Sequence, residues 1–422
     1  MNTFWQKIKD TIWTFWRHQD VPPRPVSVDM EYKEYVCTIQ PRSSFLTPLQ
    51  ADTLWAALMW THCYLHGDER KTRDLVHAYP PQILVSDGFP YGYLPKPKNF
   101  IPIEQVGTIV QSVYGDDWDK KLMGIEIAKR LAEQELLPVE LVNQLVAGER
   151  EEVILERLLR VELCPKRFIV TRNQLLGASD YQETLDLINT YCNVERCDAV
   201  TSWEDAQHKR ESHRNCARIL KSEFLKHFTL KKSSRVRKNR IDRVLMRAME
   251  ENGLFSQEEE YLLHDFWWVF VRVHPDFGED IRELFGKLAD YGYGRRKSVG
   301  KGQFDALIVE PKNISGVQMP KEYENPDGFM TLSSSYVPYH QSEFTQSRYI
   351  THIKRGKVDG YLATTRQFLK KPIVMYEAGS VFKTEKFQPY YGNKIDYIYP
   401  KKIVQYGYAF PLKGKFFTEE KE

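Results

Sequence analysis

The spacing of hydrophobic residues divides much of the chain into strands and helices. Residues 32–40 alternate like a strand, and residues 266–273 form a continuous apolar run that is typical of a buried strand. A helix is predicted around Leu54, Leu58, Met59 and Cys63, where apolar side chains recur at helical spacing. Further elements are a strand at 83–85, a helix at 278–290 and a strand at 302–309.

These elements predict an α+β fold. Strand, helix and strand in this order open a ferredoxin-like (RRM-like) unit, and the elements at 266–309 close it. A second, smaller ferredoxin-like unit is predicted after it, with strands at 329–333, 361–368, 373–377 and 405–411.

Two segments stand outside these units. Residues 103–235 are predicted to be an insertion, with helices at Trp118–Glu135 and Val139–Val161 that carry many Glu residues on their outer faces. Residues 1–18 predict an amphipathic helix rich in aromatic residues, and a proline-rich hinge follows up to residue 25. Such a helix docks on its own chain or a partner, or lies on a membrane surface; we favour docking.

Composition fits a folded protein of more than one domain. The chain has 422 residues, a net charge of +3 and 42% hydrophobic residues, so affinity for nucleic acid must come from local basic patches. Six scattered cysteines fit a reducing cytoplasm, and no apolar run is long enough to span a membrane. No residue pattern calls for a cofactor.

The densest candidate site is the glycine loop, residues 292–302, which joins the predicted helix and strand. It contains Gly292, Gly294, Gly300 and Gly302, and the side chains of Arg295, Arg296, Lys297, Ser298 and Lys301. Glycine permits positive φ, so such a backbone can turn several N–H groups toward one anion, and the cations add charge. We interpret the loop as a site for RNA phosphates.

The sequence of this loop does not fit two common types of phosphate-binding loop. A Walker phosphate loop requires Ser or Thr after the lysine, but Gly302 follows Lys301. A dinucleotide-binding loop lies between strand and helix, in the reverse order. A flexible, solvated turn remains an alternative.

The strongest charge feature is the window 209–247. It holds 14 Lys or Arg against three acidic residues, which favours binding to a polyanion over a merely solvated helix face. Within it we expect Lys238, Arg240 and Arg243 to contact RNA from a basic strand or hairpin.

A zinc site is an alternative for five Cys and His side chains in and before this window: Cys192, Cys197, His208, His213 and Cys216. Their spacing is looser than that of ordinary zinc ligands, and unpaired cysteines are the commoner explanation. No metal is therefore predicted.

Several blocks together resemble the RAMP superfamily of CRISPR systems. They are residues 47–58, Ser86–Pro90 with Leu94–Pro97, the N-x-I-D-R element at 239–243, the glycine loop, residues 371–382 and the Tyr406-Gly407-Tyr408 block. The chain is most similar to the subunit that caps the guide RNA in type III effector complexes, the fourth subunit of the Csm complex. It departs from the family after Arg243, where the Thr-Gly that often follows is replaced by Val244-Leu245.

The resemblance implies a non-catalytic subunit that holds the 5′ tag of the guide RNA. It also implies partners: the large polymerase/cyclase-like subunit and the RAMP backbone subunits. The implied division is an N-terminal helix and hinge at 1–25, a first RAMP domain at 30–312 with the insertion at about 103–235, and a second at 325–422. Phe45 and Phe89 are candidates for base stacking, although we favour core positions for both.

The alternative is an RNA-processing RAMP enzyme. Metal-independent cleavage needs a general base and acid, and His62 and His66 lie one turn apart on the first predicted helix. In such enzymes the glycine-rich loop lies near the C-terminus, whereas 120 residues follow Gly302 here. A packed histidine pair is the commoner explanation.

Overall fold

The computed structural model describes residues 31–98, 101, 103–133, 135–159, 231–239, 241–242, 247–248, 254–262, 265–314, 317–338, 341–358, 369–396 and 403–417. These residues form α-helices and antiparallel sheets, which confirms the α+β class. None of the helices in these ranges is long and apolar enough to cross a membrane. The helix predicted at 1–18 and the strand predicted at 361–368 lie outside the described residues.

The first half of the chain forms an antiparallel sheet in the order β11-β1-β10-β2, with β3 paired to β10. Its strands are β1 (Lys33–Pro41), β2 (Ile83–Val85), β3 (Phe89–Pro90), β10 (Trp267–Val273) and β11 (Phe304–Val309). Helix α2 (Ala51–His66) follows β1, and helix α13 (Ile281–Tyr291) follows β10. The resulting β-α-β-β-α-β order is the one expected for a ferredoxin-like unit.

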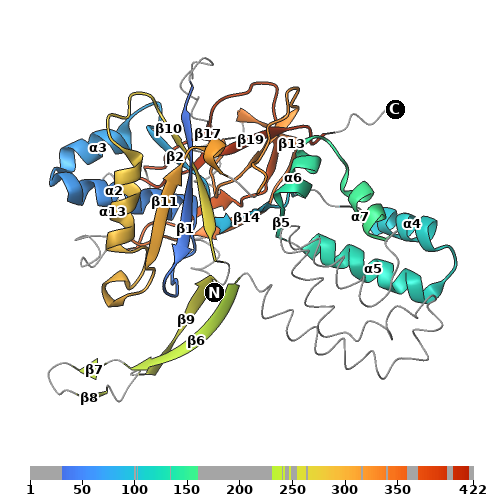
Figure 1. The fold of residues 1–422 in the computed structure, drawn as a ribbon, viewed down its shortest axis with the longest axis horizontal. Coiled ribbons are helices and arrows are strands. Elements are labelled where there is room, and N and C mark those ends of the chain that lie inside the picture. The colour runs from blue at the N-terminus through green and yellow to red at the C-terminus, as the bar shows by residue number, and fades with distance from the viewer. Residues whose placement is uncertain are drawn as a thin grey trace, which may run out of the picture.

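Helices α2 and α13 pack together beside α3 (Glu69–His77) at the left of Figure 1. Helix α13 begins where the carboxylate of Asp280 accepts a hydrogen bond from the Arg282 N–H at 2.9 Å, which satisfies a donor at the helix start. Its buried side chains recur at helical spacing: Ile281, Leu284, Phe285 and Leu288. Burying this apolar stripe holds the helix to the sheet.

The part of the insertion described between 103 and 159 is mostly helical, as predicted. It contains α4 (Ile103–Tyr114), α5 (Trp118–Glu133), β5 (Leu136–Pro138), α6 (Val139–Val146) and α7 (Glu151–Leu159), and β5 pairs with β4 (Tyr93–Pro95), which precedes the insertion. The single helix predicted at 139–161 was wrong, because the structure divides it into α6 and α7. Gly148 has a φ of 93° and donates its N–H to the carbonyl of Leu145 at 3.1 Å, so the chain turns there.

A long hairpin of β6 (Lys231–Asn239) and β9 (Leu254–Leu262) extends away from the sheet in Figure 1. Its tip includes β7 (Ile241–Asp242) and β8 (Arg247–Ala248). Backbone hydrogen bonds of 2.7 and 2.8 Å between Phe45 and Glu260 fix the base of the hairpin to the body.

The second half is built from short antiparallel strands. One sheet has the order β13-β16-β12-β19, and β14 pairs with β15 and β17 with β18. The strands are β12 (Gly328–Thr331), β13 (Glu343–Arg348), β14 (Thr351–Lys354), β15 (Ile373–Tyr376), β16 (Val381–Lys383), β17 (Tyr391–Gly392), β18 (Tyr408–Ala409) and β19 (Pro411–Gly414). No α-helix occurs among the described residues of this half, so its ferredoxin-like character stays a prediction.

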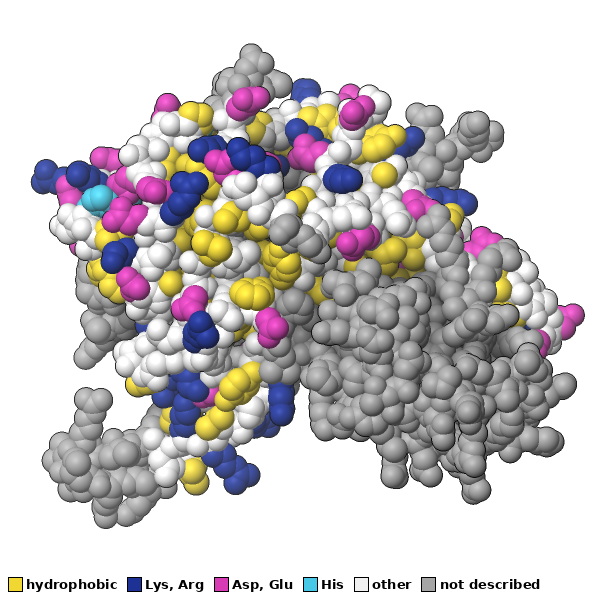
Figure 2. Space-filling view, viewed as in Figure 1, with side chains coloured by type: hydrophobic (Ala, Val, Ile, Leu, Met, Phe, Trp, Pro, Cys, Tyr) yellow, Lys and Arg dark blue, Asp and Glu magenta, His cyan; other side chains and the backbone are white. Residues whose placement is uncertain are grey.

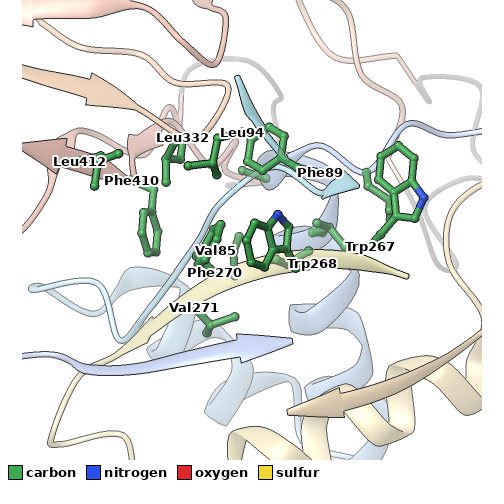
Figure 3. Packing of buried hydrophobic residues seen from close by; sticks show 14 of the residues in the cluster. Val85, Phe89, Leu94, Trp267, Trp268, Phe270, Val271, Leu332, Phe410 and Leu412 are labelled. Carbon is green, nitrogen blue, oxygen red and sulfur yellow. The ribbon is translucent and has the colours of Figure 1, made fainter. Parts of the chain in front are cut away.

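Both halves contribute to one hydrophobic core. Phe410 and Leu332 of the second half lie beside Phe270 and Val85 of the first sheet (Figure 3). Each fully buried side chain of this kind contributes about 1.5–3 kcal/mol. The two halves therefore stabilise each other, and the boundaries predicted near 312 and 325 stay a prediction.

A buried carboxylate joins the halves at the start of α2. Asp87 Oδ1 accepts hydrogen bonds from the N–H of Ala51 at 2.7 Å and of Ser334 at 3.0 Å, and Oδ2 accepts one from the Ser334 hydroxyl at 3.0 Å. Burial raises the pKa of Asp87 to about 6, against an ordinary value of 3.8. One side chain thus caps a helix and holds a loop of the second half.

We expect the stability of the protein to depend on pH through Asp87. Between about pH 4 and 6 the native protein keeps a proton that the unfolded chain releases, so the free energy of unfolding falls as pH rises, by about 1–3 kcal/mol. Asp87→Asn keeps the acceptor oxygen but cannot ionise, so it should remove this part of the slope. Urea unfolding at pH 4.5 and 7 checks the prediction. An identical slope in the variant and the wild type would contradict it.

Candidate RNA-binding site

The glycine loop leaves α13 and returns to the sheet at β11 through a single turn of 3-10 helix at Lys297–Val299. Gly292, Gly294, Gly300 and Gly302 have φ values of 75°, 75°, 79° and 65°, and Arg296 also has a positive φ, of 61°. Glycine is therefore favoured at all four positions, because other residues rarely adopt a positive φ. Two of them are needed for space as well: a Cβ on Gly302 would lie 1.9 Å from the carbonyl oxygen of Tyr293, and one on Gly294 would lie 2.6 Å from the Thr47 Cβ.

This loop is anchored to the segment that precedes α2. The Gly302 N–H donates to the Ser44 carbonyl at 2.9 Å, and the Arg295 N–H donates to the Thr47 hydroxyl at 3.0 Å. The buried Tyr293 donates its hydroxyl to the Pro48 carbonyl at 2.6 Å. A loop held at this many points is rigid, which argues against the flexible-turn interpretation.

Most amides of the loop donate to the protein itself. The N–H groups of residues 292, 293, 295 and 299–302 all donate to oxygens of the protein. These seven amides are therefore not available to an anion, and the side chains of the loop carry most of its capacity to bind one. The guanidinium groups of Arg295 and Arg296 are exposed at the surface of the loop.

A buried carboxylate connects the glycine loop to the hairpin. The Glu259 side chain, on β9, is only 2% exposed, and it accepts hydrogen bonds from Lys301 at 2.6 Å, Lys238 at 3.0 Å and the Ser44 hydroxyl at 3.0 Å. The hydrogen bond from Lys301 is the main reason that the pKa of Glu259 is lowered to about 2. Lys238 and Lys301 were predicted as phosphate-binding cations, but their first role is to pair with Glu259.

Arg296 lies against the same hairpin, with its guanidinium carbon 5.8 Å from the centre of the Phe255 ring. Strand register puts Phe255 opposite Lys238 and Gln257 opposite Val236, so these side chains share one face of the hairpin. Exposed arginines occupy the other face, at positions 235 and 237. Neither arginine was among the predicted RNA ligands, although period-2 alternation within the basic window indicates that both lie on one face of a strand.

Figure 2 shows lysine and arginine side chains gathered on the hairpin below the body of the molecule. Arg240 and Arg243, also predicted to bind RNA, lie outside the described residues, as do the five Cys and His residues of the zinc alternative. The site as described therefore consists of the glycine loop, the hairpin base and the exposed cations around them.

A cavity of about 570 Å³ lies between this junction and the second half. Phe45 and Phe89 line it and are only 1% and 5% exposed, so both are core residues, as we favoured, with one edge toward the cavity. His352 enters from β14, and neither of its ring nitrogens has a hydrogen-bond partner in the described structure. Burial lowers the pKa of His352, so the ring is held neutral.

His62 and His66 do not lie at this site. They are near the C-terminal end of α2, where both contact Glu279. The glycine loop is at the other end of the helix pair, because the Tyr293 hydroxyl meets Pro48 just ahead of α2. The structure thus separates the histidines of the nuclease alternative from the candidate RNA site.

The Glu259 cluster should contribute to stability in a pH-dependent way. Because the pKa is lowered in the native state, the stabilisation is present above about pH 4.5 and is lost as pH falls toward 2. Glu259→Gln should lower the free energy of unfolding at pH 7 by about 1–2 kcal/mol, since the lysines are partly solvated, and by little near pH 2.5. Glu258→Gln, an exposed neighbour on the opposite face, is the matched control. If Glu259→Gln lowers the free energy of unfolding equally at pH 7 and near pH 2.5, the prediction is wrong.

Similarity to known proteins is found among solved structures. No protein-family model and no curated protein matches the chain. One match is a chain from the crystal structure of the Csm3-Csm4 subcomplex in the type III-A CRISPR-Cas interference complex. It is 14% identical, with 90% of this chain and 98% of that chain covered and a TM-score of 0.48.

Two further matches come from related assemblies. A chain of the Csm1-Csm4 cassette in complex with pppApApA is 15% identical, with 91% and 99% of the two chains covered and a TM-score of 0.40. A chain of the type III-B Cmr-beta complex bound to cognate target RNA and AMPPnP is 8% identical, with 82% and 86% covered and a TM-score of 0.34.

Proposed function

We propose that this chain is a non-catalytic, RNA-binding RAMP subunit of a type III CRISPR effector complex. It holds the 5′ tag of the guide RNA and bridges the large subunit to the RAMP backbone subunits. The observation that carries the RNA-binding part is the junction at which Glu259 fixes the glycine loop to the basic hairpin. The tag and the bridging role are taken from the sequence resemblance.

Rigid placement of exposed cations is what supports RNA binding at this junction. Arg295 and Arg296 project from a loop whose backbone is anchored at several points, so little entropy is lost when they contact a phosphate. Each guanidinium can donate to two phosphate oxygens. Lys238 and Lys301 add a net positive charge, because two ammonium groups share one carboxylate.

The adjoining cavity supports a single-stranded ligand. Proteins read single-stranded RNA by holding an unstacked base against aromatic side chains while its edge meets polar groups. Trp267 and Phe89 supply apolar and aromatic surface here, and the neutral ring of His352 supplies a donor and an acceptor. A tag nucleotide turned away from its neighbours would find both kinds of contact.

A nuclease role has less support. His62 is only 3% exposed and makes hydrogen bonds to Thr72 and Glu279, so substrate does not reach it readily. A general base must come within hydrogen-bond reach of the 2′-hydroxyl. Arg295 and Arg296, the exposed arginines of the glycine loop, lie at the other end of α2.

Replacing Arg295 and Arg296 together by Ala should weaken guide-RNA binding and reduce its salt dependence. Each lost phosphate contact lowers the slope of log K against log salt by about 0.7 for a single strand, so the double variant should lose roughly 1.4. Arg70→Ala with Arg73→Ala on α3 removes the same charge from exposed positions far from the loop and serves as the control. If both double variants lower the salt slope equally, the effect comes from overall charge, and the assignment of the RNA site to the glycine loop is wrong.

Affinity purification from the native host tests the assembly role. We expect co-purified guide RNAs that share one 5′ end, together with a large subunit and several RAMP subunits. In the same preparation, repeat RNA incubated in EDTA should stay intact. Isolation of the chain alone, with metal-independent cleavage that His66→Ala abolishes, would overturn the proposal in favour of the processing enzyme.

A further inference from the structure

Three potential metal ligands converge at the C-terminal end of α2. The Nε2 atom of His62 lies 3.0 Å from Glu279 Oε1, and the Nε2 atom of His66 lies 2.9 Å from the same oxygen. His62 and His66 are one helical turn apart on α2, and Glu279 precedes α13. The three ligand atoms all lie within 4.8 Å of one another.

This spacing fits a tetrahedral metal ion. Zinc binds imidazole nitrogen at about 2.0–2.1 Å and carboxylate oxygen at about 2.0–2.2 Å, so ligand atoms around it are roughly 3.3 Å apart. The two separations from Glu279, 3.0 and 2.9 Å, need only a small outward shift, and all three ligand atoms lie within 4.8 Å of one another. Two histidines at positions i and i+4 of a helix present both rings on one face, which is a frequent zinc-binding arrangement.

The surroundings of His62 also fit a ligand. Its Nδ1 atom lies 2.6 Å from the hydroxyl of Thr72, on α3, and a hydroxyl can accept as well as donate. With Nδ1–H donating to Thr72, the lone pair of Nε2 is free to bind a metal. Metal-bound histidines almost always use their second nitrogen in such a hydrogen bond, which fixes the ring.

Burial is graded across the cluster, which suits a site open on one side. The His62 side chain is only 3% exposed, whereas those of His66 and Glu279 are 30% and 34% exposed. An ion could therefore enter from solvent, and a water molecule could supply the fourth ligand. One carboxylate would partly offset the charge of a divalent cation, and two imidazoles with one carboxylate are ligands that Zn²⁺ accepts.

We propose that His62, His66 and Glu279 form a Zn²⁺ site that ties the end of α2, and through Thr72 also α3, to the loop before α13. The site is separate from the RNA-binding junction, so its role is to stabilise the helical layer. It does not depend on the proposed function. Without metal, the Nε2–H of His62 donates a hydrogen bond to Glu279 Oε1, and the Nε2 atom of His66 lies 2.9 Å from the same oxygen.

Glu279→Gln separates a metal site from this hydrogen-bonded cluster. A glutamine oxygen still accepts the hydrogen bond from His62, but a neutral amide is a poor zinc ligand. Glu283→Gln, an exposed acid in the first turn of α13, is the matched control. His66→Gln tests a second ligand at a partly exposed position, in case the first variant folds poorly.

The experiment uses the untagged full-length protein, stripped with EDTA and titrated with Zn²⁺ against a chromogenic chelator. Thermal unfolding is followed with and without the ion. The wild type and Glu283→Gln should bind zinc equally and unfold at a higher temperature with it. Glu279→Gln and His66→Gln should bind at least ~10-fold more weakly, because each lacks a ligand.

Comparison between variants is essential because the chain has 11 histidines and six cysteines, which can bind zinc elsewhere. If Glu279→Gln and His66→Gln keep the zinc affinity and the thermal shift of the wild type, the ion binds at another place and the proposal is wrong. If no form binds zinc, the cluster is only hydrogen-bonded and the proposal is also wrong. Cobalt in place of zinc should give the intense visible bands of a tetrahedral site in the wild type and not in the two ligand variants.

Discussion

The carboxylate of Asp87 is the interaction on which the architecture depends. It follows β2, caps the first turn of α2 through the Ala51 N–H and holds Ser334 of the second half through its N–H and hydroxyl. Without it, three donors would be buried with no acceptor, and each costs about 1–3 kcal/mol. The first sheet, the helix that covers it and the second half therefore meet at one side chain, next to the cavity of the candidate RNA site.

A second buried acid, Glu259, joins the glycine loop to the hairpin as Asp87 joins the two halves, but the pKa of Glu259 is shifted in the opposite direction. Asp87 meets neutral donors, so burial dominates and raises its pKa, whereas Glu259 meets two ammonium groups that lower its pKa. The first site is therefore most stable with a proton and the second without one. Near neutral pH, Glu259 keeps Lys238 and Lys301 in place, so the hairpin and the glycine loop present their arginines in a fixed arrangement.

The glycines have a different role from the one their number suggests. A loop with so many glycines could wrap an anion with amides, yet most of these amides donate to the protein itself. Gly302 and Gly294 let the loop approach Tyr293 and Thr47 closely. The loop is thus a compact support for Arg295 and Arg296, and the charge that faces solvent comes from side chains. The same close packing places its anchor beside the start of α2.

The sequence alone determined the α+β class, the helix and strands of the first sheet, and the cationic character of the glycine loop and hairpin, because periodicity, charge and glycine content are local properties. It predicted one helix at 139–161 where the structure has α6 and α7, and it did not single out Arg235 and Arg237. Only the tertiary structure decided which charges are paired and where the histidines lie. Lys301 and Glu259 are 42 positions apart, His62 and Glu279 are 217, and Asp87 and Ser334 are 247. Such pairs form when elements pack in three dimensions, and no local pattern encodes them.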